Sequence, residues 1–368
     1  MPGAHTEPSP ANPKILVIRR DNIGDLILTT PLIRALRQRF PKAWIGVLVN
    51  SYTAQVLDNN PHIDEVFVYT KVKHRGSASV WSAYWSTLRL ILRLRRVRID
   101  YAVLASPAAS SKAQMFARRI KAKTIVGFGE CASPGYGLTA GSAGPLHEVE
   151  EVFRIARLFE IEGAPPATLI HVDDRIAERA LGLVTGKLPP GSTLIGVHIS
   201  ARKVSQRLPT EKVVELLRGL REIAPDLAFV LFWSPGASDN ATHPGDDIKG
   251  SQILQQLGDF PIVPFPTSRL SELFGGLSTC EMVICSDGGA MHAAAALGKP
   301  IVCFFGDSDP KKWHPWGVPY RLMQPESKNV ADISLAEIVN AFRNLRLGEA
   351  PVTADLQERD GFNFQPVH

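Results

Sequence analysis

The most constraining feature of the sequence is a strand–turn–helix–strand unit within residues 283–305. An apolar strand over 283–285 leads into a turn over 286–289, an Ala-rich helix extends to Gly298, and a second apolar strand covers 300–305. Two strands joined by a helix run parallel in one sheet, because the crossover returns the chain to the same end. The second half of the chain is therefore predicted to build a parallel α/β sheet.

The turn of this unit contains Asp287 and two glycines, Gly288 and Gly289. Glycine lets a ligand approach the backbone closely, and the free N–H groups at a helix start favour an anion. We predict that the diphosphate of a donor substrate binds here, and that His292, in the first turn of the helix, donates to a phosphate. The alternative is that the two glycines merely shape a tight connection.

Strands and helices alternate along the rest of the chain at a spacing that predicts open, doubly wound α/β sheets. The further predicted strands cover residues 14–19, 44–49, 65–69, 101–105, 123–128, 193–198 and 227–233. Helices are predicted over residues 25–40, 79–98, 147–161, 173–184 and 334–347, over 268–274 with Ser268 as the N-cap, and from near Thr210. The polar segments 129–145 and 234–250 are expected to be loops.

The length of the chain, 368 residues, exceeds what one core of ordinary size holds, so two domains are expected. A Pro/Gly-rich patch at 186–191 is the predicted hinge. The predicted division is a disordered lead over 1–13, a first domain over 14–186, a second domain over 187–347 and a polar tail over 348–368.

The composition, with 45% hydrophobic and 21% charged residues, is typical of a globular protein. The net charge of +5 suits a phosphorylated substrate, a nucleic acid or an anionic membrane, and does not choose among them. No C-x-x-C pair occurs, so we expect buried free thiols in a reducing compartment rather than disulfides. The four cysteines are Cys131, Cys280, Cys285 and Cys303.

No apolar run approaches the ~20 residues that span a bilayer, and residues 1–13 lack the basic and apolar parts of a signal peptide. We therefore expect a cytoplasmic protein. The helix predicted over 79–98 is basic and amphipathic, and we interpret it as a sheet-covering helix with a solvated basic face. The alternative, as a secondary role, is attachment to an anionic membrane face. The aromatic and basic residues concerned are Trp81, Tyr84, Trp85, Arg89, Arg93, Arg95, Arg96 and Arg98, with Lys71, Lys73, His74 and Arg75 nearby.

Two α/β domains joined by a hinge place their strand ends at one cleft, where ligands bind in open sheets. In the first domain, Asp25 starts a helix directly after such a strand end. It is either a general base that deprotonates an acceptor hydroxyl or a helix-start charge stabilised by the dipole. The candidates for contact with the acceptor are Arg19, Arg20, Asn22 and Gly24.

In the second domain, Ser200 and Ala201 offer a hydroxyl and backbone N–H groups at a strand end. The Asp307-Ser308-Asp309 turn either holds a divalent cation or contains ordinary turn formers. No zinc pattern, Walker A sequence, Gly-x-Ser-x-Gly elbow or Gly-x-Gly-x-x-Gly fingerprint occurs. The positive charges available for a diphosphate leaving group are Arg202, Lys203 and Arg207.

Three segments in this order resemble glycosyltransferase family 9, the bacterial lipopolysaccharide heptosyltransferases. They are residues 14–31 with Gly24-Asp25, residues 286–300 with Asp287-Gly288-Gly289 and His292, and residues 306–313. The resemblance spans about residues 14 to 345. It implies an α/β protein of GT-B fold, in which two facing Rossmann-like, doubly wound parallel-sheet domains enclose an interdomain cleft. The first domain would bind the acceptor and the second the nucleotide-sugar donor.

The resemblance implies an inverting enzyme that moves a heptose from ADP-L-glycero-D-manno-heptose to an inner-core lipopolysaccharide acceptor. No metal or other cofactor is required, and no nucleic acid is a partner. In this resemblance Asp25 matches the base, while Ser200 and Ala201 match the loop that meets the phosphates. The donor-binding segment corresponds to Asp287, Gly288, Gly289 and His292. The protein would work in the cytoplasm, with the basic helix as a peripheral contact to the inner membrane.

Two residues depart from the family pattern. Gln206 stands where the family often has Lys, and Gly288 where a small polar residue usually follows Asp. Arg207 or Lys203 would then supply the missing positive charge. The alternative functions are another GT-B transferase with a different nucleotide sugar and a non-catalytic relative that binds a nucleotide sugar or a glycan.

Overall fold

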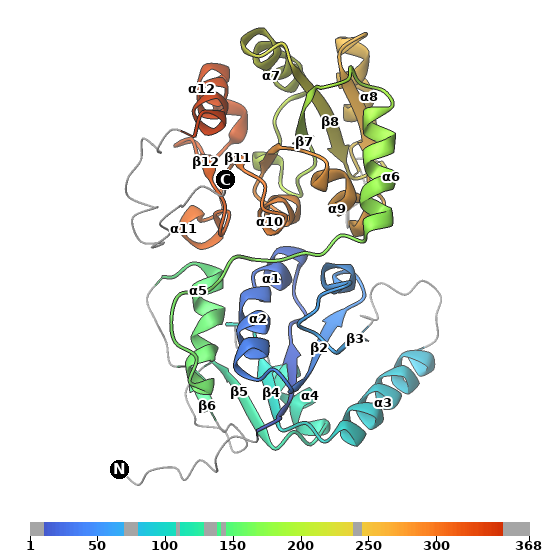
Figure 1. Ribbon diagram of the computed structural model, residues 1–368, viewed down its shortest axis with the longest axis vertical. Helices are drawn as coiled ribbons and strands as arrows, with labels where there is room; N and C mark the ends of the chain where they lie inside the picture. The colour runs from blue at the N-terminus through green and yellow to red at the C-terminus, as the bar shows by residue number, and fades with distance from the viewer. Residues whose placement is uncertain are drawn as a thin grey trace.

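The computed structural model describes residues 11–69, 80–107, 111–128, 138–140, 145–237 and 245–348. Two α/β bodies lie one above the other, each built around its own sheet, and the chain crosses between them (Figure 1). We call them the N-terminal domain, which holds β1 to β6, and the C-terminal domain, which holds β7 to β12.

The N-terminal sheet has six parallel strands in the order β3-β2-β1-β4-β5-β6. The central strand β1 is apolar and buried on both faces, as expected for a parallel sheet covered by helices. β6 lies within the segment predicted to be a loop, so that prediction was wrong for three residues. The strands are β1 (Lys14–Ile18), β2 (Trp44–Asn50), β3 (Glu65–Tyr69), β4 (Tyr101–Leu104), β5 (Thr124–Phe128) and β6 (Leu138–Ala140).

The C-terminal sheet repeats this arrangement, with six parallel strands in the order β12-β11-β10-β7-β8-β9. In both sheets the strand order reverses beside the first strand, at β1/β4 and at β7/β10, which is where open α/β sheets bind ligands. The predicted fold class is confirmed. The strands are β7 (Thr193–His198), β8 (Leu227–Trp233), β9 (Ile262–Pro266), β10 (Met282–Ser286), β11 (Ile301–Phe304) and β12 (Tyr320–Met323).

The helix predicted over 25–40 is two helices, because Pro31 has no N–H to donate to the Ile27 carbonyl. The Thr30 hydroxyl donates to that carbonyl instead, at 2.7 Å. The first of the two helices begins at Ile23, so Asp25 is its third residue and not its first. The helices of this domain are α1 (Ile23–Ile27), α2 (Thr30–Arg39), η1 (Ala54–Leu57), α3 (Val80–Val97), α4 (Ser111–Arg119), α5 (Glu148–Phe153) and η3 (Arg154–Phe159).

Two local predictions in the C-terminal domain were wrong. The segment 234–250, predicted to be a loop, contains the start of α8, and residues 238–244 lie outside the described part. The helix predicted over 268–274 begins at Leu270, because the N-cap is Arg269 and not Ser268. The helices of this domain are α6 (Asp174–Thr185), η4 (Val204–Gln206), α7 (Thr210–Ile223), α8 (Asp247–Leu257), α9 (Leu270–Ser278), α10 (Gly289–Ala296), α11 (Pro310–Trp313), η5 (Val330–Asp332) and α12 (Leu335–Arg346).

The chain crosses between the domains earlier than the sequence predicted. Helix α6 packs against α9 of the C-terminal domain, and the lack of a side chain on Gly275 makes room for Ile176. The crossing therefore occurs over residues 160–173, the green strand-free segment in Figure 1, and not at the Pro/Gly patch 186–191. That patch joins α6 to β7 within one domain.

One apolar cluster contains buried residues of both sheets, so the domains share a core. Helices α1 and α10 are in direct contact across the interface. A hydrogen bond from Leu270 N to Gln55 Oε1, at 3.0 Å, also crosses it. The crossing segment is tied to the N-terminal domain by a hydrogen bond from Leu169 N to Thr30 Oγ1, at 3.0 Å. Three of the cysteines are buried free thiols, as predicted, and Cys131 lies outside the described residues.

Candidate active site

The turn between β10 and α10, residues 286–289, which we call the glycine corner, is partly exposed to solvent. Gly288 has φ 157° and ψ −172°, a conformation that residues with a side chain rarely adopt. Among the described residues, no atom lies within 4 Å of a Cβ placed on Gly288. The corner therefore offers the two features that suit a diphosphate, an approachable backbone and the amides of a helix start.

The glycine corner faces the start of α1 in the N-terminal domain. A Cβ on Gly289 would lie 3.3 Å from Ile23 Cβ, and a Cβ on Gly24 would lie 2.6 Å from His292 Cδ2. The close approach of the two helices thus depends on glycine at both positions. His292 is buried at this contact, and its Nδ1 has no hydrogen-bond partner within the described ranges.

His292 lies within electrostatic reach of a carboxylate from each domain. Burial lowers the pKa of His292, whereas the charges of Asp287 and Asp25 act to raise it. The structure thus gathers around one imidazole the predicted donor-binding Asp287 and the predicted base Asp25. The sequence predicted these groups to share a cleft from their positions at strand ends alone.

The Asp25 carboxylate is held by three hydrogen bonds at the edge of the interface. Oδ1 accepts from Arg19 Nη2 at 2.9 Å, and Oδ2 accepts from the amide and the side-chain Nδ2 of Asn22, each at 2.9 Å. The Asn22 amide contact is part of the capping box at the start of α1, so Asp25 also has a structural role there. The side chain keeps 11% of its surface exposed. It is therefore oriented firmly, and only a small part of it reaches solvent.

Arg19, predicted to contact the acceptor, is buried and has another role. Its guanidinium, 2% exposed, donates to the Ala105 carbonyl, to Asp25 and, at 2.7 Å, to Glu148 Oε1. Lys312 of the C-terminal domain also lies close to Glu148, with Nζ 3.4 Å from Oε2. The sequence analysis missed Glu148, because its partner lies 129 positions away and no motif joins them.

Comparison with known proteins identifies this architecture. The profile of glycosyltransferase family 9 (heptosyltransferase) matches residues 87–336. The chain belongs to glycosyltransferase family 9.

Relatives of this family 9 protein are similar over most of their length. Lipopolysaccharide heptosyltransferase 3 of Escherichia coli K12 is 23% identical over 305 residues, which are 80% of this chain and 82% of that protein. Lipopolysaccharide heptosyltransferase 2 of Salmonella typhimurium is 26% identical over 309 residues, 81% of this chain and 84% of that protein.

Solved structures of family 9 proteins share the fold. The glycosyltransferase family 9 protein of Veillonella parvula has a TM-score of 0.79 at 19% identity, over 92% of this chain and 98% of that chain. E. coli ADP-heptose lipopolysaccharide heptosyltransferase II has a TM-score of 0.71 at 21% identity, over 91% of this chain and 99% of that chain. The protein is thus a glycosyltransferase of the lipopolysaccharide heptosyltransferase type with a GT-B fold.

In this family 9 enzyme, Gln206 joins the glycine corner to the loop over residues 199–209, which we predicted to meet the phosphates and call the phosphate loop. The Gln206 side chain, which is buried, donates to Asp287 Oδ2 at 3.1 Å and to Ser308 Oγ at 2.8 Å. The backbone carbonyl of Gln206 accepts from the Ser286 hydroxyl at 2.6 Å. A neutral amide therefore occupies the position where the family often has a Lys, and it orients Asp287 without adding positive charge.

Two basic residues of the phosphate loop form ion pairs, one with a buried carboxylate and one with an exposed carboxylate. Arg207 donates to the Ala201 carbonyl at 2.6 Å and to Asp246 at 3.1 Å, so its charge is neutralised by a buried carboxylate. Lys203 pairs with Asp307 at 2.9 Å, and both side chains are about half exposed. Exposed pairs of this kind contribute little stability and exchange readily.

Two further loop residues complete this side of the site. Ser200 Oγ accepts from the Ser234 amide at 2.9 Å, which ties the loop to the end of β8 and leaves the hydroxyl proton available. Arg202 is exposed. Burial raises the pKa of Tyr52 in the N-terminal domain, and the charge of Arg202 acts to lower it.

The Asp307-Ser308-Asp309 turn uses its two carboxylates for separate purposes. Asp307 pairs with Lys203, and Asp309 caps α11 by accepting from the Lys311 amide at 3.0 Å. These contacts match the turn-former interpretation of the two aspartates. A metal here would have to displace an existing partner of each carboxylate.

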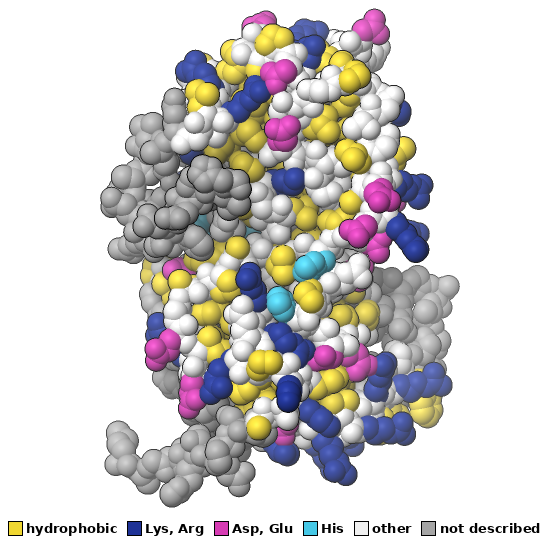
Figure 2. Space-filling model, viewed as in Figure 1, with side chains coloured by type: hydrophobic (Ala, Val, Ile, Leu, Met, Phe, Trp, Pro, Cys, Tyr) yellow, Lys and Arg dark blue, Asp and Glu magenta, His cyan; other side chains and the backbone are white. Residues whose placement is uncertain are grey.

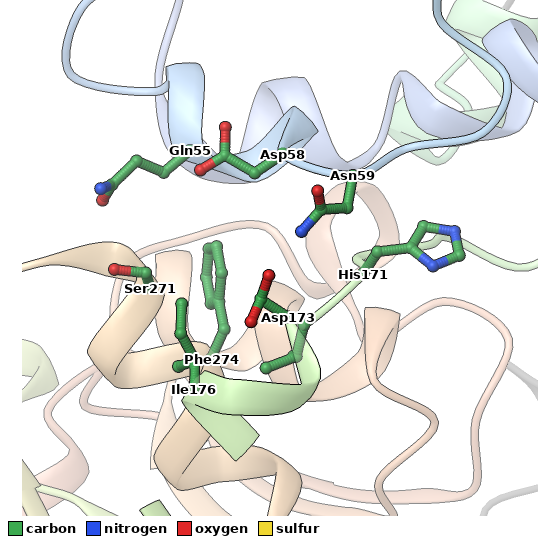
Figure 3. Close-up of a pocket in the computed structure, with 9 residues that line it drawn as sticks. Gln55, Asp58, Asn59, His171, Asp173, Ile176, Ser271 and Phe274 are labelled. Atoms are coloured by element: carbon green, nitrogen blue, oxygen red, sulfur yellow. The ribbon is translucent and has the colours of Figure 1, made fainter. Parts of the chain in front are cut away.

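Apart from the glycine corner, a recess lies between the domains, beside the crossing segment (Figure 3). It measures about 250 Å³, and the close-up shows side chains of η1 facing Phe274 and the start of α6. Burial raises the pKa of Asp58 in its wall. The lining of this recess includes two carboxylates, Asp58 and Asp173, and no lysine or arginine. The recess is therefore unsuitable for a negatively charged diphosphate. Its lining residues include Gln55, Asp58, Asn59, His171, Asp173 and Phe274.

The basic helix α3 covers the N-terminal sheet and also exposes charge. Ile91 and Leu94 are buried against the sheet, whereas Trp85 and Leu92 are 55% and 44% exposed. Lys and Arg side chains gather over this end of the domain in Figure 2. The exposed arginines are Arg89, Arg93, Arg95, Arg96 and Arg98; Lys71, Lys73, His74 and Arg75 lie outside the described residues, as do the side chains of Trp81 and Tyr84. Within the described ranges, no helix has the length and apolar character to cross a membrane.

Proposed function

We propose that this glycosyltransferase moves a heptose from ADP-L-glycero-D-manno-heptose to a lipopolysaccharide core acceptor with inversion at the anomeric carbon. One observation supports the assignment of roles above all others. The glycine corner, with open space beside Gly288, faces the start of α1, which presents Asp25. Donor phosphates and an acceptor hydroxyl would then meet at the boundary of the two domains.

The proposed reaction is a direct displacement. Asp25 takes the proton of the acceptor hydroxyl as the oxygen attacks the anomeric carbon, and the bond from that carbon to the diphosphate oxygen breaks. The electron pair leaves with ADP, whose charge is stabilised by the amides of the glycine corner. Arg19 and Asn22 hold the Asp25 carboxylate in place during the attack. No metal is included in the proposal.

The positive charge for the leaving diphosphate is assigned to Arg202 and Lys203. Arg202 is exposed, and Lys203 can exchange its exposed partner Asp307 for a phosphate. Arg207 is assigned the role of holding the loop, because Asp246 and the Ala201 carbonyl already occupy its guanidinium.

The experiment that tests this proposal combines transfer with nucleotide binding. Wild type and Asp25→Asn are assayed for ADP release and product formation from ADP-heptose with an inner-core acceptor. Binding of ADP, UDP and GDP is measured by calorimetry. We expect Asp25→Asn to abolish transfer, with a loss of at least about 10²-fold for a missing general base. ADP should bind both proteins equally, and retained transfer by the variant would overturn the assignment.

A second candidate function rests on Gln206. With an amide in place of a lysine, the chain could bind a nucleotide sugar or glycan without transferring it, or could prefer another nucleotide. Preferential binding of UDP or GDP in the same calorimetry would support a different donor. Binding of ADP-heptose without turnover by the wild type would support a non-catalytic relative.

We also propose that α3 brings the enzyme to the inner membrane, from the cytoplasmic side. Exposed arginines beside Trp85 and Leu92 are suited to anionic headgroups. Sedimentation with anionic and with neutral vesicles tests this. A variant with Arg89, Arg93 and Arg96 changed to Gln should lose the preference for anionic vesicles, and an unchanged preference would refute it.

A further inference from the structure

We propose that Glu148 is a positioning residue for the catalytic base, and that Lys312 makes this positioning depend on the arrangement of the two domains. The inference rests on the proposed role of Asp25. It concerns a charged network that joins the start of α1, the start of α5 and helix α11 of the other domain. None of its members beyond Asp25 and Arg19 was predicted from the sequence.

The network is centred on one buried guanidinium. Arg19 Nη2 donates to Asp25 Oδ1 at 2.9 Å and to Glu148 Oε1 at 2.7 Å. Nε of the same group lies 3.1 Å from Asp21 Oδ2. An Nη2 group has two protons, so the two carboxylates each receive one. Glu148 and Asp25 are thus fixed relative to each other through a single nitrogen.

The charges of this network do not balance within the N-terminal domain. Asp21, Asp25 and Glu148 supply three negative charges, and Arg19 supplies one positive charge. Asp25 and Glu148 are buried and need compensation, whereas the Asp21 side chain is 40% exposed. In the described residues, a second cation paired with this network comes from the C-terminal domain. Lys312 Nζ lies 3.4 Å from Glu148 Oε2, the oxygen that Arg19 does not use.

The contact between α5 and the C-terminal domain is built in detail around this pair. His147, next to Glu148, accepts at Nδ1 from the Val149 amide at 3.1 Å, so its Nε2 carries the proton and donates to the His314 carbonyl at 3.0 Å. Its ring also stacks on Trp316, with centroids 4.7 Å apart. The start of α5 is therefore docked on residues 312–316, and domain separation would remove Lys312 from Glu148.

These contacts predict opposite effects on the base. The positive charge of Arg19 favours the ionised form of Asp25. The negative charge of Glu148 acts against this effect, and so helps the Asp25 carboxylate to accept a proton. Lys312 reduces the Glu148 charge and so acts in the other direction. The charged and titratable groups that surround Asp25 in the described residues are Arg19, Asp21, Glu148, Asp287, His292 and Lys312.

The test is the pH dependence of kcat for four variants of the full-length chain. Glu148→Gln keeps an acceptor for Arg19 but removes the charge, and Lys312→Met removes the cation from the other domain. Glu151→Gln is the control for the first, because it is on the same helix but pairs with Arg154. Lys311→Met is the control for the second, because it is an exposed neighbour on α11.

We expect the acid limb of the profile to move to lower pH in Glu148→Gln and to higher pH in Lys312→Met. The shift in Glu148→Gln should be about one pH unit, the lower end of what a charge within ~4–6 Å produces. The shift in Lys312→Met should be smaller, because Lys312 lies beside Glu148 and acts on Asp25 through it. The controls should follow the wild type. A merely structural role would lower the yield of folded protein or kcat at every pH, and would not move the limb in opposite directions.

The outcome also separates this inference from the proposed function. If Asp25→Asn abolishes transfer but the acid limb moves in neither Glu148→Gln nor Lys312→Met, Glu148 is not a positioning residue and the inference fails alone. If the acid limb moves in the same direction in both variants, the dependence on Lys312 is refuted. If Asp25→Asn retains transfer, the assignment of the base fails, whatever the other variants show.

Discussion

Substitution of Gly24 by alanine tests whether α1 and α10 pack as closely as the structure shows. The new Cβ would lie 2.6 Å from His292 Cδ2 and 3.2 Å from Nε2, closer than ordinary van der Waals contact. His292 is buried and cannot swing into solvent. Helix α1 must therefore move by several tenths of an ångström, and Asp25, the next residue, moves with it.

The magnitude follows from two opposing terms. Overpacking costs about 1–3 kcal/mol, whereas alanine in place of glycine within a helix contributes about 1 kcal/mol. The net loss of unfolding free energy is then about 0–2 kcal/mol. Catalysis should suffer more, because a displacement near 1 Å can lower the rate by about 10²-fold.

Denaturant unfolding and steady-state transfer assays measure the two effects on the same preparation. Gly182→Ala is the matched control, since Gly182 is an exposed glycine of α6 with no described atom within 4 Å of its Cβ. The control should be stabilised by about 1 kcal/mol and retain full activity. Gly24→Ala with a similar gain in stability and wild-type turnover would refute the described packing of the two helices.

Three further predictions follow from buried polar groups. Gln206→Lys places a cation beside Asp287, and tighter ADP binding in calorimetry is expected; unchanged binding would show that this position does not affect the donor. Burial lowers the pKa of His198 to about 4, and that of His147 falls well below its usual value, so both are neutral when folded. Because the unfolded chain takes up these protons first, stability should fall as pH drops from about 6.5 toward 4, and a flat urea midpoint over this range would contradict it. Burial raises the pKa of Cys280 to about 12, so a thiol reagent should label it only upon unfolding, and rapid labelling of the native protein would refute its burial.

The sequence was sufficient for several structures that depend on neighbouring residues. The unit β10–α10–β11 was predicted from apolar runs separated by glycines, and α12 begins directly after Ser334, within one residue of the predicted start. The break between α1 and α2 was missed even though Pro31 is visible, because proline is tolerated in the first turn of a helix and residues 25–40 were predicted as one helix that begins shortly before it.

Contacts between distant segments were beyond the sequence. Glu148 reaches Arg19 across 129 positions, and Gln206 reaches Asp287 across 81. The domain crossing was misplaced because a Pro/Gly patch can occur in any loop. The domain to which α6 belongs depends on its packing against Gly275 of α9. The residues on either side of the gap were predicted, but the network that holds the base was not.

The position of a bound nucleotide tests the central claim most directly. A crystal structure with ADP should place the diphosphate within about 3 Å of the amides of the glycine corner, across the gap from Asp25. A diphosphate bound elsewhere, away from Gly288 and Gly289, would contradict the account.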